Sequence, residues 1–181
     1  MRKKKKKALL LIDIQEKIIN PINNKDSIIK NIKKLLRAYQ ILEKNIFLSE
    51  QNPLKLGKTI PNILPEVNFT QIEKMDFSLA SSQLIFEEFA KKNITNLIIC
   101  GFETHICIQQ SVLEFLKKGY EVLLICDAMG SRNDLDHEIA LQRMLHKGAI
   151  ITTTESIIFE ICQTSDRKEF KEISNIIKNQ R

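Results

Sequence analysis

Short apolar runs alternate along the chain with stretches in which apolar residues recur every three or four positions. The runs are mostly continuous rather than alternating with polar residues, which is typical of strands buried on both faces of a sheet. The predicted strands are residues 8–12, 45–48, 71–74, 96–100, 121–126 and 149–152.

The stretches between these runs have helical periodicity. Ile28 and Ile32 lie on one face of the first predicted helix, for which Asp26 or Ser27 is the expected cap. The predicted helices are residues 26–44, 79–92, 104–118, 135–147, 155–163 and 166–179. This alternation predicts an α/β fold, namely a three-layer αβα sandwich with a Rossmann-like parallel six-stranded sheet and helices on both faces.

One segment interrupts the alternation. Residues 51–69 contain three prolines and Gly57, which predicts a long loop. A loop of this length inside a compact domain is usually functional or acts as a lid. We find no internal repeat and no interior linker, so residues 8–181 are interpreted as a single domain.

The net positive charge of the chain comes from its N-terminal residues. The net charge is +6, but residues 2–7 are all Lys or Arg, and the remainder has as many basic as acidic residues. We therefore expect residues 1–7 to form a disordered basic leader, with a weak anionic contact as the alternative. A nucleic-acid-binding domain would carry its positive charge on a face, so no nucleic-acid partner is expected.

The apolar run at 8–12 is too short for a signal-peptide core or a membrane span. The four cysteines are irregularly spaced and form no CxxC pair. These observations predict a soluble, reduced, cytoplasmic protein without a membrane partner.

Candidate chemistry is expected at the carboxyl ends of the strands, where ligands bind in parallel sheets. Asp13 follows the first strand, Lys74 ends the third, and Cys107 lies just after the fourth. If Thr104 caps the following helix, Cys107 is in its first turn, where free N–H groups and the helix dipole favour a thiolate. The alternative is a structural Cys on the apolar face of that helix.

His105 is an unsuitable base for Cys107, because side chains at i and i+2 diverge by about 200° on a helix. A carboxylate directly after a buried strand is costly unless it is paired, so Asp13 is the better base and Lys74 its natural partner. A phosphoryl-accepting role for Asp13 would require a second Asp where Gln15 stands.

Asp127 also follows an apolar run. We expect its carboxylate to cap backbone N–H groups or to pair with Arg132.

Five segments, in order and at matching spacing, resemble the isochorismatase-like cysteine hydrolases: 9-LLLIDIQ-15, 74-KMDFS-78, 101-GFETHICIQQS-111, 127-DAMGSR-132 and 148-GAIITTTE-155. The run 50-EQNPLKLGKTIP-61 is similar to the subgroup called isochorismatase domain-containing proteins.

The resemblance implies a catalytic triad of Cys107, Asp13 and Lys74, with a thioester intermediate. It also implies a non-proline cis peptide at Phe102–Glu103, which would direct the backbone N–H groups of Glu103 and Cys107 towards a developing oxyanion.

The substrate-pocket candidates are Gln15, Phe77 and His105. Nicotinamidase relatives bind a metal through an Asp and two His after the second strand, but residues 49–69 contain no His, so we expect neither a metal nor another cofactor.

Isochorismatases that cleave a vinyl ether typically lack the Cys, so Cys107 favours acyl or amide chemistry. The leading expectation is a hydrolase acting on a small amide, ureido or related C–N bond. Relatives of this kind usually form dimers or larger homo-oligomers. The alternatives are a catalytically silent scaffold that binds partners and, more weakly, a thiol-redox role for Cys107.

Overall fold

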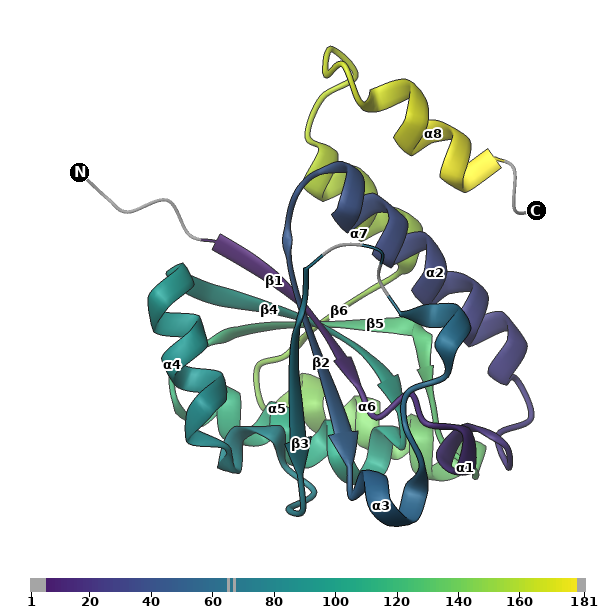
Figure 1. Cartoon of the computed structure of the whole chain (residues 1–181), viewed down its shortest axis with the longest axis vertical. Helices are drawn as coiled ribbons and strands as arrows, with labels where there is room; N and C mark the ends of the chain where they lie inside the picture. Colours follow the sequence, from purple (N-terminus) through teal and green to yellow (C-terminus); the bar gives the residue numbers. More distant parts are fainter. Residues whose placement is uncertain (1–5, 65, 67, 179–181) are drawn as a thin grey trace.

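The computed structural model describes residues 6–64, 66 and 68–178, which form one six-stranded, all-parallel sheet in the order β3-β2-β1-β4-β5-β6 (Figure 1). The strands are β1 (Lys6–Ile12), β2 (Asn45–Gln51), β3 (Thr70–Lys74), β4 (Ile94–Phe102), β5 (Glu121–Gly130) and β6 (Ile150–Thr152). The predicted fold class is confirmed, and the chain reverses strand order at β1, where parallel sheets commonly bind ligands.

Helices cover both faces of the sheet (Figure 1). One face packs against α2 (Lys25–Ile41), α7 (Thr154–Cys162) and α8 (Phe170–Lys178), and the other against α4 (Gln83–Lys92), α5 (Gln109–Lys117) and α6 (Asp134–His146). Successive side chains of a strand point to opposite faces. Leu9 and Leu11 of β1 therefore enter the first core, and Leu10 and Ile12 enter the second.

Several element boundaries differ from those expected, and three of them correct a specific prediction. β1 begins at Lys6, so Lys6 and Lys7 belong to the sheet rather than to the basic leader, and residues 1–5 lie outside the described part of the chain. The predicted cap of α2 is wrong, because the helix begins at Lys25 after Asn24, and Asp26 lies in its first turn. The last helix begins at Phe170 rather than at 166.

The segment after β2, predicted to be a long loop, contains short helical turns. α3 (Pro53–Leu56) and the 3₁₀ turn η1 (Pro61–Ile63) each begin with proline, whose fixed φ suits the first helical position. A further short helix, α1 (Glu16–Ile19), follows β1. No helix within the described ranges is long and apolar enough to cross a membrane.

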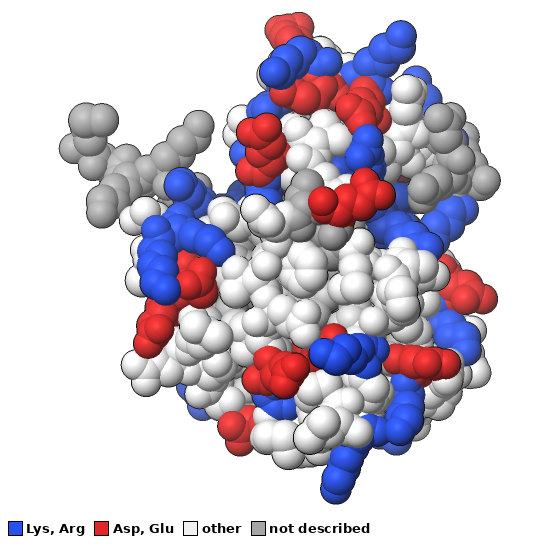
Figure 2. All heavy atoms as spheres, viewed as in Figure 1, with Lys and Arg blue, Asp and Glu red and all other residues white. Residues whose placement is uncertain are grey.

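Charged side chains of both signs are interspersed on the face shown in Figure 2, around a central area without charge. On this face, the basic residues do not gather into a stripe. The distribution agrees with the neutral body expected from the sequence.

Candidate functional site

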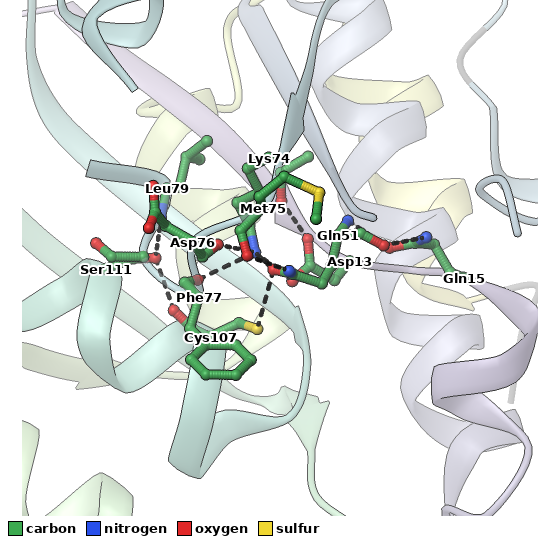
Figure 3. A network of polar contacts seen from close by, with 12 residues as sticks. Asp13, Gln15, Gln51, Lys74, Met75, Asp76, Phe77, Leu79, Cys107 and Ser111 are labelled. Carbon is green, nitrogen blue, oxygen red and sulfur yellow. Dashed lines mark hydrogen bonds and ion pairs between the residues drawn. The ribbon is translucent and has the colours of Figure 1, made fainter. Parts of the chain in front are cut away.

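Polar side chains are buried where β1, β2 and β3 end. Asp13, Ser49, Gln51 and Lys74 are each at most 7% exposed, although such residues usually lie at the surface. They tolerate burial because they bond to one another across three adjacent strands (Figure 3). The parallel register brings these strand ends to one edge of the sheet.

Asp13 and Lys74 form a buried ion pair. Lys74 Nζ lies 2.8 Å from Asp13 Oδ2, and the two side chains are 2% and 0% exposed. The other carboxylate oxygen of Asp13 accepts a hydrogen bond of 2.7 Å from Ser49 Oγ. Asp13 itself has a φ of 53°, a left-handed conformation that is uncommon outside glycine and clusters at functional sites. The pairing that the sequence suggested for Asp13 is therefore present.

Gln51 joins this pair to Cys107 and was missed by the sequence analysis. Its Oε1 accepts from Lys74 Nζ at 2.6 Å and lies 4.0 Å from Cys107 Sγ, the distance of a weak sulfur hydrogen bond (Figure 3). Its Nε2 donates to the carbonyl of Met75 at 2.7 Å. Gln15 fixes the backbone of Gln51 from both sides, donating to its carbonyl at 3.0 Å and accepting from its N–H at 2.7 Å. The only sequence signal was a polar residue three places beyond an apolar run.

Cys107 lies in a π-helical turn, Thr104–Ile108, that precedes α5. Thr104 is inside this turn rather than its cap, so the expected capping was wrong. Turns of this kind are rare and occur frequently at functional sites. The Ser111 hydroxyl donates to the carbonyl of Cys107 at 2.6 Å and accepts from the N–H of Leu79 at 2.8 Å. Ser111 thereby fixes the Cys107 backbone against the neighbouring 3₁₀ turn η2 (Leu79–Ser81).

The predicted cis peptide at Phe102–Glu103 is wrong, because no peptide bond in the described residues is cis. The chain turns here through Glu103, which adopts a left-handed conformation with a φ of 58°. Gly101 precedes it with a φ of 131°, and a Cβ at that position would lie 2.1 Å from the carbonyl oxygen of Ile12. The assignment of the Glu103 and Cys107 N–H groups to an oxyanion hole stays a prediction.

The pKa of the Cys107 thiol is raised to about 12, mainly by burial and also by the nearby Asp13 charge, while Lys74 opposes the shift. Cys107 is therefore a neutral thiol in the resting protein, whereas a helix N-terminus alone would favour a thiolate. Asp13 raises the pKa of the Cys107 thiol and Lys74 lowers it, so removal of either side chain changes this pKa.

A cavity of about 220 Å³ opens beside Cys107. Its lining residues are Lys17, Ile18, Pro21, Gln51, Leu56, Phe77, Glu103, Ile106, Cys107 and Arg132. Half of these are apolar, and Glu103 Oε1 is paired with Arg132 Nε at 3.0 Å. Phe77, a predicted pocket residue, is therefore in the lining.

The other two pocket candidates lie elsewhere. Gln15 donates a hydrogen bond to the backbone carbonyl of Gln51. His105 Nδ1 lies 3.0 Å from Ser131 Oγ, at hydrogen-bond distance. His105 therefore lies away from the Cys107 thiol, as helix geometry predicted.

Asp127 caps α7 by accepting bonds from the N–H and the hydroxyl of Thr154 at 2.8 and 2.9 Å. This is one of the two roles we expected for it; Arg132 pairs with Glu103 instead.

No group of three or more His, Cys, Asp or Glu side chains in the described ranges is placed to hold a metal ion.

Comparisons with known proteins identify relatives of this chain. The isochorismatase domain model matches residues 7–156. Isochorismatase family protein 1B of Dictyostelium discoideum is 37% identical over 179 residues, covering 96% of this chain and 87% of the relative. Isochorismatase domain-containing protein 2 of Xenopus laevis is 32% identical, covering 94% and 82%.

Among solved structures, the MAR1 ribonuclease from Caenorhabditis elegans is similar with a TM-score of 0.90. It is 32% identical in sequence, and the match covers 96% of this chain and 90% of that one.

Proposed function

The chain belongs to the isochorismatase family, and from this premise we propose that it is a cysteine hydrolase that cleaves the C–N bond of a small amide or ureido substrate. One observation carries the proposal. Cys107 contacts Gln51, which bonds to the buried Asp13–Lys74 pair, and this group lies beside a cavity of about 220 Å³. A cavity of this size, lined by side chains such as Ile18, Leu56 and Phe77, favours a small substrate with an apolar body.

In the proposed first step, Cys107 Sγ attacks the carbonyl carbon while its proton passes to the Asp13 carboxylate. The proton must leave during the attack, because a thiol with a pKa of about 12 is ionised in only about one molecule in 10⁵ at pH 7. Lys74 keeps its charge and holds the Asp13 carboxylate in place, and Gln51 aligns the Lys74 ammonium.

The tetrahedral intermediate carries its negative charge on the former carbonyl oxygen, for which the N–H groups of Glu103 and Cys107 are the proposed donors. The C–N bond then breaks, and the leaving amine takes the proton from Asp13, which leaves a thioester on Cys107. A water molecule attacks the thioester and gives its proton to Asp13. The acid product departs as the thiolate of Cys107 takes that proton back.

Ammonia release from a panel of small primary amides and ureido compounds tests this proposal. We expect turnover of at least one member, and we expect Cys107→Ser to abolish it. Cys126→Ala is the control, because Cys126 is a partly exposed thiol within β5 of the same sheet, and its charged neighbour is Asp127 rather than the Asp13–Lys74 pair. Absence of turnover across the panel, or turnover that survives Cys107→Ser, would favour a silent scaffold.

The name of the Caenorhabditis elegans relative makes RNA the alternative substrate to examine. The charged groups in the cavity lining are Lys17, Arg132 and Glu103, and Arg132 is already paired with Glu103. Binding an RNA strand requires several phosphate contacts from basic residues, and the face shown in Figure 2 has no such stripe. We therefore expect no Cys107-dependent cleavage of single-stranded RNA in the same assay.

A further inference from the structure

One oxygen of the Glu103 carboxylate is buried in the wall of the cavity beside Cys107 without a hydrogen-bond partner. Glu103 is 7% exposed and belongs to the lining of that cavity, together with Cys107 and Arg132. Its Oε1 pairs with Arg132 Nε at 3.0 Å, but its Oε2 accepts no hydrogen bond from any described residue. Buried polar atoms in folded proteins are nearly always hydrogen-bonded, because burial removes their contact with water. The carboxylate therefore has an unused capacity to accept a hydrogen bond.

His105 does not supply the missing donor. Its Nδ1 lies 3.5 Å from Glu103 Oε2 and 3.0 Å from Ser131 Oγ, so the imidazole is at hydrogen-bond distance from the serine instead. Its Nε2 faces Asp136 Oδ2 at 4.0 Å, and neither His105 nor Asp136 belongs to the cavity lining. The donor that suits Glu103 Oε2 is then a group of the molecule that occupies the cavity.

The charges around the cavity favour a neutral donor over a cationic one. Arg132 already pairs with Glu103, and Lys17 adds a further positive charge to the lining. An ammonium group in this cavity would be repelled by the excess positive charge and would lose its hydration. An uncharged N–H group has neither cost, and it can still donate to the carboxylate.

We propose that Glu103 is a specificity-determining residue whose side chain accepts a hydrogen bond from an N–H group on the far side of the substrate carbonyl from the leaving ammonia. The inference rests on the proposed hydrolase function and narrows its substrate class. A ureido compound, R–NH–CO–NH2, has such a group beside the carbonyl that Cys107 attacks, whereas a carboxamide, R–CH2–CO–NH2, has a methylene there. Displacement of ammonia leaves R–NH–CO–S on Cys107, and water then releases the carbamic acid R–NH–COOH. Ureido compounds are therefore the preferred substrates of this site.

The backbone holds Glu103 in a position that suits this role. Its φ of 58° is left-handed, and Arg132 Nε fixes one of its carboxylate oxygens. The backbone N–H of Glu103 is a proposed donor to the oxyanion, so the side chain of the same residue is close to the reacting carbonyl. A hydrogen bond to this carboxylate therefore discriminates between groups attached directly to that carbonyl.

Propylurea and pentanamide are a matched pair of probes, because they differ only in NH against CH2 beside the carbonyl. We expect the ratio of kcat/KM for propylurea to that for pentanamide to fall about ten- to a hundredfold in Glu103→Gln, the effect of losing a hydrogen bond to a charged group. The Gln side chain keeps its oxygen for Arg132 and presents an NH2 group, which is a donor, to the substrate N–H. Taking the ratio within each variant cancels the intrinsic reactivity of the two compounds and any loss of folded protein.

Asp136→Asn is the matched control for this ratio. It removes a negative charge 4.0 Å from His105 Nε2, outside the cavity lining, and should leave the ratio unchanged. A fall of the same size in Asp136→Asn would overturn the inference, because the effect would then come from charge rather than from contact with the substrate.

Binding measured without turnover separates this inference from the hydrolase proposal. In Cys107→Ser, titration followed by ligand-observed NMR should give a dissociation constant for propylurea at least about tenfold lower than that for pentanamide. The difference should disappear in Cys107→Ser/Glu103→Gln.

The two readouts together decide between the outcomes. If turnover depends on Cys107 but Glu103→Gln changes neither the kcat/KM ratio nor the relative affinities, the inference is overturned, the hydrolase proposal stands, and Glu103 is only a structural partner of Arg132. If neither compound is turned over but the affinity difference is present and depends on Glu103, the hydrolase proposal fails and the role of Glu103 in ligand selection is supported.

Discussion

Replacing Lys74 with Met removes the positive partner of a carboxylate that has no access to solvent. Lys74 Nζ is 2.8 Å from Asp13 Oδ2, and it also donates to Gln51 Oε1 at 2.6 Å and to the carbonyl of Phe77 at 3.0 Å. In Lys74→Met, the Ser49 hydroxyl still donates to Asp13, but the carboxylate has lost its positively charged partner. Breaking a buried ion pair from one side typically costs 3–5 kcal/mol, so we expect the free energy of unfolding to fall by about 3–5 kcal/mol.

The double variant Asp13→Asn/Lys74→Met sharpens this prediction, because it removes both charges of this buried pair. Met fills a volume close to that of Lys, and Asn can still accept from Ser49 Oγ. We expect the double variant to lose only about 1–2 kcal/mol. Asp13→Asn alone breaks the same pair from the other side and should also cost about 3–5 kcal/mol. The coupling between the two substitutions should therefore be at least about 4 kcal/mol, in the direction that makes the double variant more stable than additivity predicts.

Urea unfolding followed by far-ultraviolet circular dichroism measures these values. Lys91→Met is the control, because Lys91 forms an exposed ion pair with Glu88 at 2.8 Å and its loss should leave the unfolding midpoint essentially unchanged. If the losses from Asp13→Asn and Lys74→Met add without coupling, the two side chains do not form the buried pair described above, and the reasoning about the site is refuted.

Further predictions concern Cys107 and its supports. Alkylation of resting Cys107 by iodoacetamide should rise about tenfold per pH unit between pH 7 and 10, because its pKa of about 12 keeps it protonated throughout, and a plateau below pH 9 would contradict this. Since the unfolded thiol ionises near its usual 9.0, this group should also lower stability as pH rises from about 9 towards 12, which a Cys107→Ala comparison of urea midpoints would detect. Ser111→Ala removes the hydroxyl that links the Cys107 carbonyl to Leu79 N–H and should cost about 1–3 kcal/mol in urea unfolding. Gly101→Ala should cost more than about 3 kcal/mol, because its Cβ would lie 2.1 Å from Ile12 O, and wild-type stability would show that this close approach is wrong.

The sequence predicted most of the sheet because strands such as β1 and β4 contain continuous apolar runs, which are typical of strands buried on both faces. It underestimated β2, which continues through Ser49 and Gln51. Those polar residues were interpreted as the start of a loop, since nothing local shows that partners from β1 and β3 will cover them. Gln51 was missed as a site residue for the same reason.

Backbone geometry around Cys107 was the least predictable part of the site. Periodicity predicted one α-helix from 104 onwards, whereas the chain forms a π-helical turn first. A π-helical turn adds one residue to a single turn of the helix, and so short a change does not show in the spacing of apolar residues along the sequence. The expected cis peptide came from family resemblance and was wrong for this chain, in which left-handed Glu103 makes the turn. The pairing of Asp13 with Lys74, by contrast, followed from the cost of burying an unpaired carboxylate.

The covalent intermediate on Cys107 tests the central claim most directly. The best amide of the panel would be mixed with the protein, quenched in acid during turnover, and located by peptide mass spectrometry. We predict that the peptide containing Cys107 gains the mass of the substrate minus ammonia, and that Asp13→Asn abolishes this gain. Turnover with no adduct on Cys107 at any quench time, together with continued turnover by Cys107→Ser, would contradict the account.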